Sequence, residues 1–216
     1  MIKLFNIYVI HYKKLVKRKE VILKSLENLK IPFTFIDKYD RNNLNSSDLI
    51  FFTEDKDNIH KSIFLSHIEA YKKHIESNYK ISLILEDDSV PGLKFMNNSK
   101  KYLNNLPDDF DLFFISPGKN NFHIPIYLRV PFKKIYKKKN IQTKWGGHGA
   151  SRCADAYFIS KKCAIKLYEE FQVSRSINTS IDWWMNLMID KYNLSVYWAE
   201  PTIIETNKYV SAFDIN

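Results

Sequence analysis

Apolar and polar residues alternate in blocks along the chain, and the blocks predict strands and helices in turn. Short runs rich in β-branched and aromatic residues, typical of strands, occupy residues 4–10, 31–37, 81–85, 110–116, 154–160 and 194–199. Segments with a helical apolar period cover residues 15–29, 61–77, 95–106, 161–171 and 181–192. This alternation predicts an α/β protein, and its opening strand–helix–strand predicts a parallel sheet.

Three stretches lack a clear period. Residues 41–58 predict a loop, residues 119–149 combine short strand-like pieces with a basic cluster, and an irregular tail starts at Pro201. The chain shows no internal repeat and no linker. Its 216 residues are the length of one domain, so we expect a single domain over residues 1–216.

The composition excludes several protein classes. Hydrophobic residues make up 45% of the chain and aromatic residues 15%, which argues against intrinsic disorder. The formal net charge of +9 favours anionic partners such as nucleic acid, anionic lipid or phosphate-bearing small molecules. The excess is scattered lysine that peaks at residues 133–139, which is typical of a solvated face, and no nucleic-acid-binding signature accompanies it.

Cysteine usage and hydropathy predict a cellular location. Cys153 and Cys163 form neither a disulfide framework nor a metal site, which favours a reducing compartment. No apolar run approaches the ~20 residues of a membrane span, and the N-terminal run predicts a buried strand rather than a signal peptide. We therefore expect a cytoplasmic protein. The Lys-, Asn- and Ile-rich composition indicates an AT-rich genome, of a giant virus (then in the host cytoplasm) or a bacterium.

The sharpest local feature is an acidic triplet, Glu86-Asp87-Asp88, directly after a buried strand. Ligands of open α/β sheets bind at the carboxyl ends of strands. Glu86 and Asp88 are two residues apart, so on an extended backbone they point to the same side. Two such carboxylates suit Mg²⁺ or Mn²⁺. The alternative is an acidic turn that is solvated or caps the next helix.

Two histidines share one face of the helix predicted over residues 61–77. His67 follows Ser66, and His74 lies seven residues later. Taken alone, His67 is most simply a hydrogen-bonded helix histidine near the sheet. We interpret His74 as structural or exposed.

The helix predicted over residues 181–192 opens with Asp182-Trp183-Trp184. Ser180 or Asn178 could cap this helix, and Asp182 could simply stabilise its N-terminal dipole. Alternatively, Asp182 lies beside a pocket and takes a proton from an acceptor hydroxyl. One of the two tryptophans could then stack on a sugar while the other packs in the core.

A glycine-rich stretch at residues 145–152 reads Trp-Gly-Gly-His-Gly-Ala-Ser-Arg. It suggests a flexible loop that approaches a ligand, or an ordinary surface loop. It matches neither the P-loop nor the dinucleotide fingerprint.

Four segments together resemble glycosyltransferase family 25, the lipooligosaccharide and collagen-galactosyltransferase-like family. They are YVIHYKKLVKRKEVILKSLENLKIPFTFID, FLSHIEAYKKHI followed by LILEDDSVP, ADAYFISKKCAIKLYEEF, and IDWWMNLMI with YWAEP. Their order and spacing fit the family over nearly the whole chain.

The resemblance implies a GT-A-like fold: a single Rossmann-like domain with a mostly parallel central sheet flanked by helices. The nucleotide-binding half would be about residues 1–118 and the acceptor-side half about 119–216. The implied activity is that of an inverting hexosyltransferase, assisted by Mn²⁺ or Mg²⁺. It would move galactose, glucose or N-acetylglucosamine from a UDP-sugar to a hydroxyl of a glycan or protein acceptor.

The resemblance also implies roles for the acidic residues. Glu86 and Asp88 fall on the family's acidic, DxD-like motif, so that Asp88 would hold the metal and Glu86 the metal or the ribose. Asp87 would contact the donor sugar. Asp182 is the candidate general base.

Four further residues are implied to bind or support the donor. Arg18 would lie near the nucleotide, and Ser66 and His67 would line the site or support it from behind. His11 stands where the family often has Asn-Leu and would replace a nucleotide contact. The C-terminal histidine ligand of many such enzymes is missing, so Glu205, Asn207, Asp214 or water would take its place.

Two other functions remain open from the sequence. A non-catalytic protein of the same fold, binding a glycan or a nucleotide-sugar, would fit the missing third metal ligand. A basic nucleic-acid-binding module would rest on net charge alone and predicts steeply salt-dependent binding.

Overall fold

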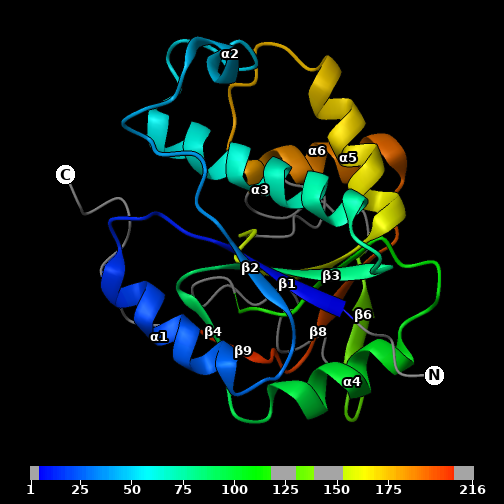
Figure 1. The fold of residues 1–216 in the computed structure, drawn as a ribbon. Coiled ribbons are helices and arrows are strands. Elements are labelled where there is room, and N and C mark those ends of the chain that lie inside the picture. Colours follow the sequence, from blue (N-terminus) through cyan, green and yellow to red (C-terminus); the bar gives the residue numbers. More distant parts are fainter. Residues whose placement is uncertain (1–4, 118–129, 139–152, 207–216) are drawn as a thin grey trace.

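A mixed seven-stranded sheet, in the order β2-β1-β3-β7-β5-β8-β6, runs through the molecule (Figure 1). The structure is a computed structural model, and it describes residues 5–117, 130–138 and 153–206. The strands of this sheet are β1 (Phe5–Ile10), β2 (Phe33–Ile36), β3 (Ile81–Glu86), β5 (Leu112–Phe114), β6 (Ile135–Lys137), β7 (Ala156–Ser160) and β8 (Val196–Ala199). Within these residues only β7 and β6 run against the other strands. The expected α/β class with a mostly parallel central sheet is confirmed.

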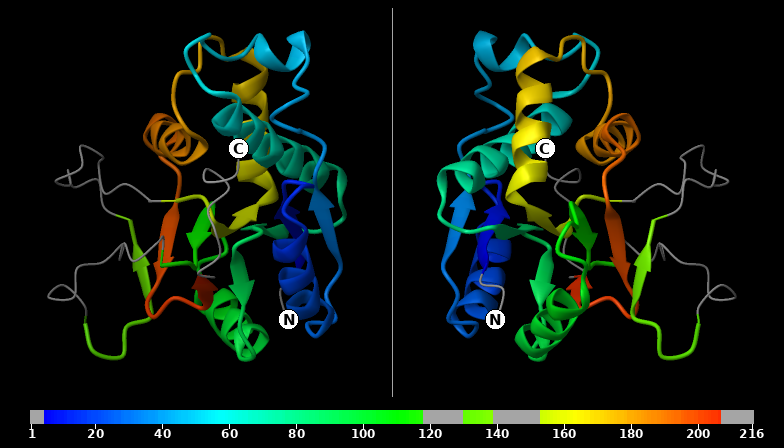
Figure 2. Two further views of the ribbon diagram at one scale, coloured as in Figure 1. Left: turned by 90° about the vertical axis from the view of Figure 1, so that its left-hand side faces the viewer. Right: turned by 90° about the vertical axis from the view of Figure 1, so that its right-hand side faces the viewer.

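Helices cover both faces of the sheet, as Figures 1 and 2 show. On one face lie α3 (Asn58–Glu76), α5 (Lys161–Val173) and α6 (Ile181–Tyr192). On the other lie α1 (Val16–Glu27) and α4 (Phe95–Asn105). The helices predicted from the apolar period are therefore all present.

Strand β1 shows how the alternation of side chains builds two cores. Its residues point to opposite faces in turn. Ile7 and Val9 pack with Leu26 of α1 in one buried cluster. Tyr8 packs with Phe64 of α3 in the other. Because both faces are covered, the strand is buried throughout, and the sequence shows a nearly continuous apolar run.

Two predictions about irregular segments are wrong. The expected loop at 41–58 contains a short helix, α2 (Ser46–Leu49), whose N-terminus is held by a capping box between Asn45 and Asp48. The expected irregular tail contains β9 (Ile204–Thr206), which pairs antiparallel with β4 (Ser89–Pro91). Both elements are too short to show a hydrophobic period. The tail thus returns to the segment that directly follows the acidic triplet.

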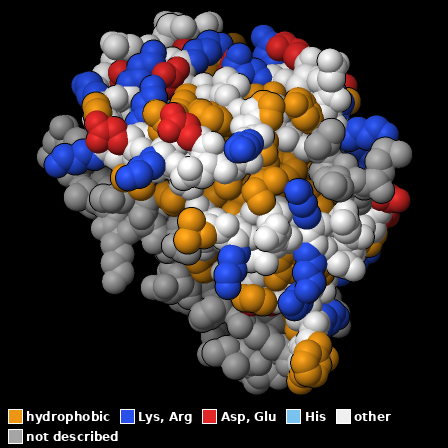
Figure 3. Space-filling view, turned by 60° about the horizontal axis from the view of Figure 1, so that its bottom comes forward, with side chains coloured by type: hydrophobic (Ala, Val, Ile, Leu, Met, Phe, Trp, Pro, Cys, Tyr) orange, Lys and Arg blue, Asp and Glu red, His pale blue; other side chains and the backbone are white. Residues whose placement is uncertain are grey.

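One face of the surface is shown in Figure 3. Lysine and arginine side chains are scattered over it among apolar ones and do not gather in one stripe. Within the lysine-rich segment Lys133, Lys134 and Lys137 are exposed, as expected of a solvated face. Lys138 is an exception, because it is buried with its Nζ 3.6 Å from Asp190 Oδ1. Among the described residues, no helix has both the length and the apolar character needed to cross a membrane.

Candidate active site

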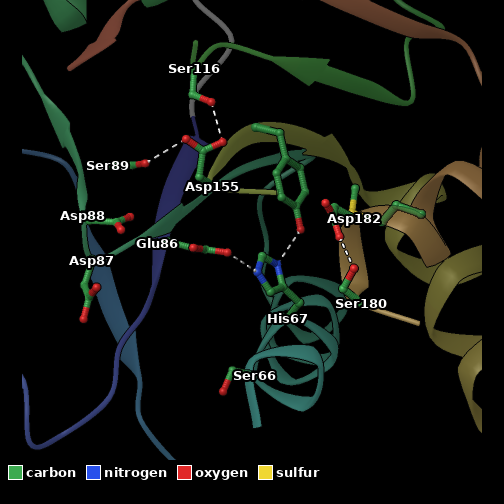
Figure 4. Close-up of polar contacts among 12 residues, drawn as sticks. Ser66, His67, Glu86, Asp87, Asp88, Ser89, Ser116, Asp155, Ser180 and Asp182 are labelled. Carbon is green, nitrogen blue, oxygen red and sulfur yellow. Dashed lines mark hydrogen bonds and ion pairs between the residues drawn. The ribbon is translucent and has the colours of Figure 1, made fainter. Parts of the chain in front are cut away.

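The acidic triplet lies at the edge of the sheet where β3 ends. Strands β1 and β3 are parallel neighbours with Ile10 opposite Glu86, so their carboxyl ends meet there. The side chains of Glu86 and Asp88 are 29% and 23% exposed, whereas that of Asp87 is 6% exposed. In Figure 4 Glu86 and Asp88 point to one side and Asp87 points away from them. The sequence prediction for Glu86 and Asp88 agrees with this geometry.

Asp87 is a buried anchor for the turn after β3. His11, directly after β1, lies with its Nδ1 2.8 Å from Asp87 Oδ2. Arg18 of α1 donates to Asp87 Oδ1 at 2.7 Å, and the same nitrogen lies 3.2 Å from Asp88 Oδ2. A buried carboxylate is tolerated when it is paired and hydrogen-bonded in this way. His11 and Arg18 therefore meet the acidic triplet itself, and both oxygens of Asp87 are engaged by them.

His67 lies behind Glu86 and is completely buried. Its Nε2 is 3.5 Å from Glu86 Oε1, and its Nδ1 is 2.8 Å from the hydroxyl of Tyr157 (Figure 4). Burial lowers the pKa of His67 to about 3, although the negative charges of Asp182 and Asp155 act in the opposite direction. The imidazole is therefore neutral at physiological pH, and it is a support for the site rather than a surface that a donor could touch.

Ser66 has its hydroxyl committed within α3. It is 3% exposed, and its Oγ donates to the carbonyl oxygen of Ser62 at 2.8 Å. In Figure 4 its side chain points away from the acidic residues. The implied role of Ser66 at the donor stays a prediction.

Asp155 is a third acid at the site, and sequence reasoning missed it. Because β7 is antiparallel to β3, the start of β7 lies beside the end of β3, and the amide of Glu86 donates to the carbonyl oxygen of Asp155 at 2.7 Å. The carboxyl accepts hydrogen bonds from Ser89 and Ser116 (Figure 4). Burial, with the charges of Glu86 and Asp88, raises the pKa of Asp155 to about 7. The only sequence signal was its position at the start of the strand predicted over residues 154–160.

Asp182 lies in the first turn of α6, as predicted, and is partly exposed. Ser180 is the N-cap residue, but its side chain does not cap the helix, contrary to one expectation. Its hydroxyl donates instead to Asp182 Oδ1 at 2.5 Å (Figure 4). The two tryptophans separate clearly: Trp184 is buried against Phe64, and Trp183 is 39% exposed.

The donor set suits a hard divalent cation bound together with its ligand. Three carboxyl groups lie at this edge, and the pKa of Asp155 is raised first by burial and then by the charges of Glu86 and Asp88. Yet no group of three or more His, Cys, Asp or Glu side chains in the described part of the chain is arranged to hold a metal ion. Mg²⁺ and similar ions are commonly held by one or two carboxylates plus substrate phosphates and water. Glu86 and Asp88 fit that arrangement.

Several expected residues fall outside the described part of the chain. They are Asn207, Asp214 and the glycine-rich segment at residues 145–152. Of Glu205, only the backbone is described, and it pairs with Val90 two residues after Asp88.

Comparison with known proteins fixes the family. The model of glycosyltransferase family 25, described as LPS biosynthesis protein, matches residues 5–185. The chain belongs to this family. A search of curated proteins found no significant match. Family membership and the observed sheet agree with the GT-A-like fold that the sequence resemblance implied, and they support a glycosyltransferase.

Solved structures that match this chain include A197 from STIV and two glycosyltransferases, all with TM-scores below 0.5. The structure of A197 from STIV matches with a TM-score of 0.48 and 10% identity, over 96% of this chain and 87% of that one. A glycosyltransferase involved in glycosylation of the major capsid of PBCV-1 matches with a TM-score of 0.43 and 10% identity, over 79% and 64%. The galactosyltransferase LgtC, solved with donor and acceptor sugar analogs, matches with a TM-score of 0.47 and 14% identity, over 90% and 73%.

Proposed function

We propose that this family member is an inverting, metal-assisted hexosyltransferase. It would move galactose, glucose or N-acetylglucosamine from a UDP-sugar to a hydroxyl of a glycan or protein acceptor. The observation that carries this proposal is the pair of partly exposed carboxylates, Glu86 and Asp88, at the carboxyl end of β3. Family membership supports the transferase class.

The residues divide the chemistry between them. Asp88, with Glu86, would hold Mn²⁺ or Mg²⁺, and the bound ion would supply positive charge to neutralise the diphosphate of the departing UDP. Arg18 fixes the side chains of Asp87 and Asp88 and so keeps the turn in one conformation. Asp182 takes the proton of the acceptor hydroxyl, with Ser180 orienting its carboxylate.

The transfer is a single displacement. The acceptor oxygen bonds to the anomeric carbon as the bond from that carbon to the diphosphate oxygen breaks, and the proton goes to Asp182. Attack opposite the leaving group inverts the anomeric carbon, so no nucleophilic side chain is required.

Two substitutions test these roles in assays of turnover with UDP-sugars and Mn²⁺. Asp88→Asn should lower metal-dependent turnover by about 100-fold or more, because one carboxylate charge at the diphosphate is lost. Asp182→Asn should lower kcat by a similar factor with little change in donor affinity. Glu169→Gln is the control, because Glu169 is an exposed acid of helix α5.

Unchanged turnover in Asp88→Asn would exclude the metal assignment. If Asp182→Asn instead loses donor binding at normal turnover per bound donor, Asp182 is not the base.

A further inference from the structure

A chain of buried polar contacts joins Glu86 to helix α6. From Glu86 Oε1 it passes to His67 Nε2 at 3.5 Å, and from His67 Nδ1 to the Tyr157 hydroxyl at 2.8 Å. The Tyr157 and Tyr71 hydroxyls are 2.8 Å apart, and the Tyr71 hydroxyl is also placed to donate to Met185 Sδ at 3.5 Å. His67, Tyr71 and Tyr157 have no exposed surface. In Figure 4 the His67 side chain extends from helix α3 toward Glu86.

The protons in this chain can be arranged in two ways. In one, Tyr71 donates to Tyr157, Tyr157 donates to His67 Nδ1, and His67 carries its proton on Nε2. In the other, every donor is reversed, so that the Tyr71 proton goes to the Met185 sulfur and a bare Nε2 lone pair faces Glu86. A thioether is a weak acceptor, and a lone pair facing a carboxylate is repulsive. The first arrangement is therefore the more stable.

We propose that Tyr71 and Tyr157 hold His67 as the Nε2–H tautomer and that His67 is a positioning residue, donating this proton to Glu86. The donated hydrogen bond would fix Oε1 and leave Oε2 free to bind the metal or the donor. Outer partners of this kind orient metal-binding side chains. The effect of this hydrogen bond on catalysis rests on the proposed function, whereas the arrangement of the protons does not.

In this structure His67 Nε2 is buried and makes no hydrogen bond within the described part of the chain, and Glu86 Oε1 lies 3.5 Å from it, so the proposed hydrogen bond needs a small approach of the two groups. Hydrogen bonds at active sites are often long in the free protein and tighten in the complex. Since His67 is 0% exposed, its effect on the reaction passes through Glu86.

The first test is ¹⁵N NMR of the histidine-labelled protein without ligand, with the His67 signals assigned by their loss in His67→Gln. We expect a protonated-type Nε2 resonance and an unprotonated-type Nδ1 resonance. In Tyr157→Phe the Nδ1 resonance should shift, because its hydrogen bond is removed. A protonated Nδ1 in the wild-type protein, or an Nδ1 resonance indifferent to Tyr157→Phe, overturns the proposal.

The second test compares two variants, His67→Gln and His67→Asn, in which an amide side chain replaces the imidazole. Glutamine places an N–H near the position of Nε2, whereas asparagine places its amide near Nδ1 and leaves Glu86 without this donor. His67→Asn should weaken Mn²⁺ binding and lower kcat/KM by about 10-fold or more, and His67→Gln should lose clearly less. His74→Asn removes another fully buried histidine from the same helix and should leave turnover unchanged.

Equal losses in His67→Gln and His67→Asn would mean that His67 is only structural, and would overturn the positioning role. If the wild-type protein transfers no sugar from any donor, the proposed function fails. The NMR result and the Mn²⁺ titrations of the two variants then still decide the inference.

Discussion

At the scale of single residues, the unusual group is Asp155, a buried acid placed beside two other acids. Its hydrogen bond from Ser116 favours the charged form, but burial and the charges of Glu86 and Asp88 outweigh that contribution. In the unfolded chain an aspartate ionises near pH 3.8, and in the folded protein Asp155 does so near pH 7. Between these values the folded state keeps a proton that the unfolded state has lost. Rising pH therefore lowers the free energy of unfolding.

Replacing Asp155 by asparagine should remove this dependence. The pKa of Asp155 differs by about three units between the folded and unfolded states. This difference lowers the free energy of unfolding of the wild-type protein by on the order of 4 kcal/mol between pH 4 and pH 8. Asp155→Asn should therefore gain stability relative to the wild type as the pH rises through this range. The measurement is urea unfolding at several pH values in the presence of EDTA. Parallel stability curves for the two proteins would show that Asp155 titrates normally.

At the scale of the elements, a second buried histidine ties α3 to the sheet. Ser82 of β3 donates its hydroxyl proton to Asn6 of β1 at 2.5 Å, so His74 must donate from Nδ1 to the same Ser82 oxygen, 2.6 Å away. Burial, then the charge of Lys161, lowers the pKa of His74 to about 4, although a hydrogen bond to the backbone of Ile159 acts in the opposite direction. Protonation of His74 therefore opposes the docking of the helix.

The packing of α3 should consequently weaken in acid. From pH 6.5 down to pH 4 the unfolded chain binds a proton at this histidine that the folded protein does not. The wild-type protein should then lose on the order of 3 kcal/mol of stability through His74. His74→Asn keeps a donor for Ser82 but cannot titrate, so the stability deficit of the variant should shrink as the pH falls. A deficit that stays constant from pH 7 to pH 4 would contradict this account.

The element scale also shows what the sequence could predict. The long helices and the buried strands were predictable because their apolar periods extend over many residues. The direction of β7 was not, because an apolar strand buried on both faces reads the same in either direction. Without that direction, Asp155 could not be placed at the edge that holds Glu86. The pairing of β4 with β9 was equally hidden, since three-residue strands carry no period.

Within the site, the sequence predicted where the acidic residues lie in the fold better than it predicted which side chains contact them. Glu86, Asp88 and Asp182 stand at the element ends where the patterns put them. The partners of Asp87 could not be predicted, because its contacts with His11 and Arg18 span 76 and 69 residues along the chain. Such contacts depend on which strands are neighbours, and the amino-acid pattern alone does not determine that order.

At the scale of the whole molecule, the carboxyl ends of β1 and β3, the turn after β3 and the start of β7 form one ligand edge. A ligand that binds this edge only in the folded state must raise the apparent stability of the entire domain. At 100 times the dissociation constant the gain is about 2.7 kcal/mol. For a chain of this length, that corresponds to a rise in Tm of about 5–10 °C.

We therefore expect UDP, or one UDP-sugar, to raise the Tm by this amount in the presence of Mn²⁺ and much less in EDTA. The Mn²⁺-dependent part of the rise should be lost in Asp88→Asn and kept in Glu169→Gln, because Glu169 is an exposed acid of α5 away from the ligand edge. The comparison uses thermal unfolding with a panel of nucleotides and nucleotide-sugars, and the sugar with the largest rise identifies the donor. If no nucleotide changes the Tm under any metal condition, the ligand edge does not bind a nucleotide donor. Steeply salt-dependent binding of DNA or RNA by the same protein would then make its net charge of +9, rather than its acidic edge, the basis of its function.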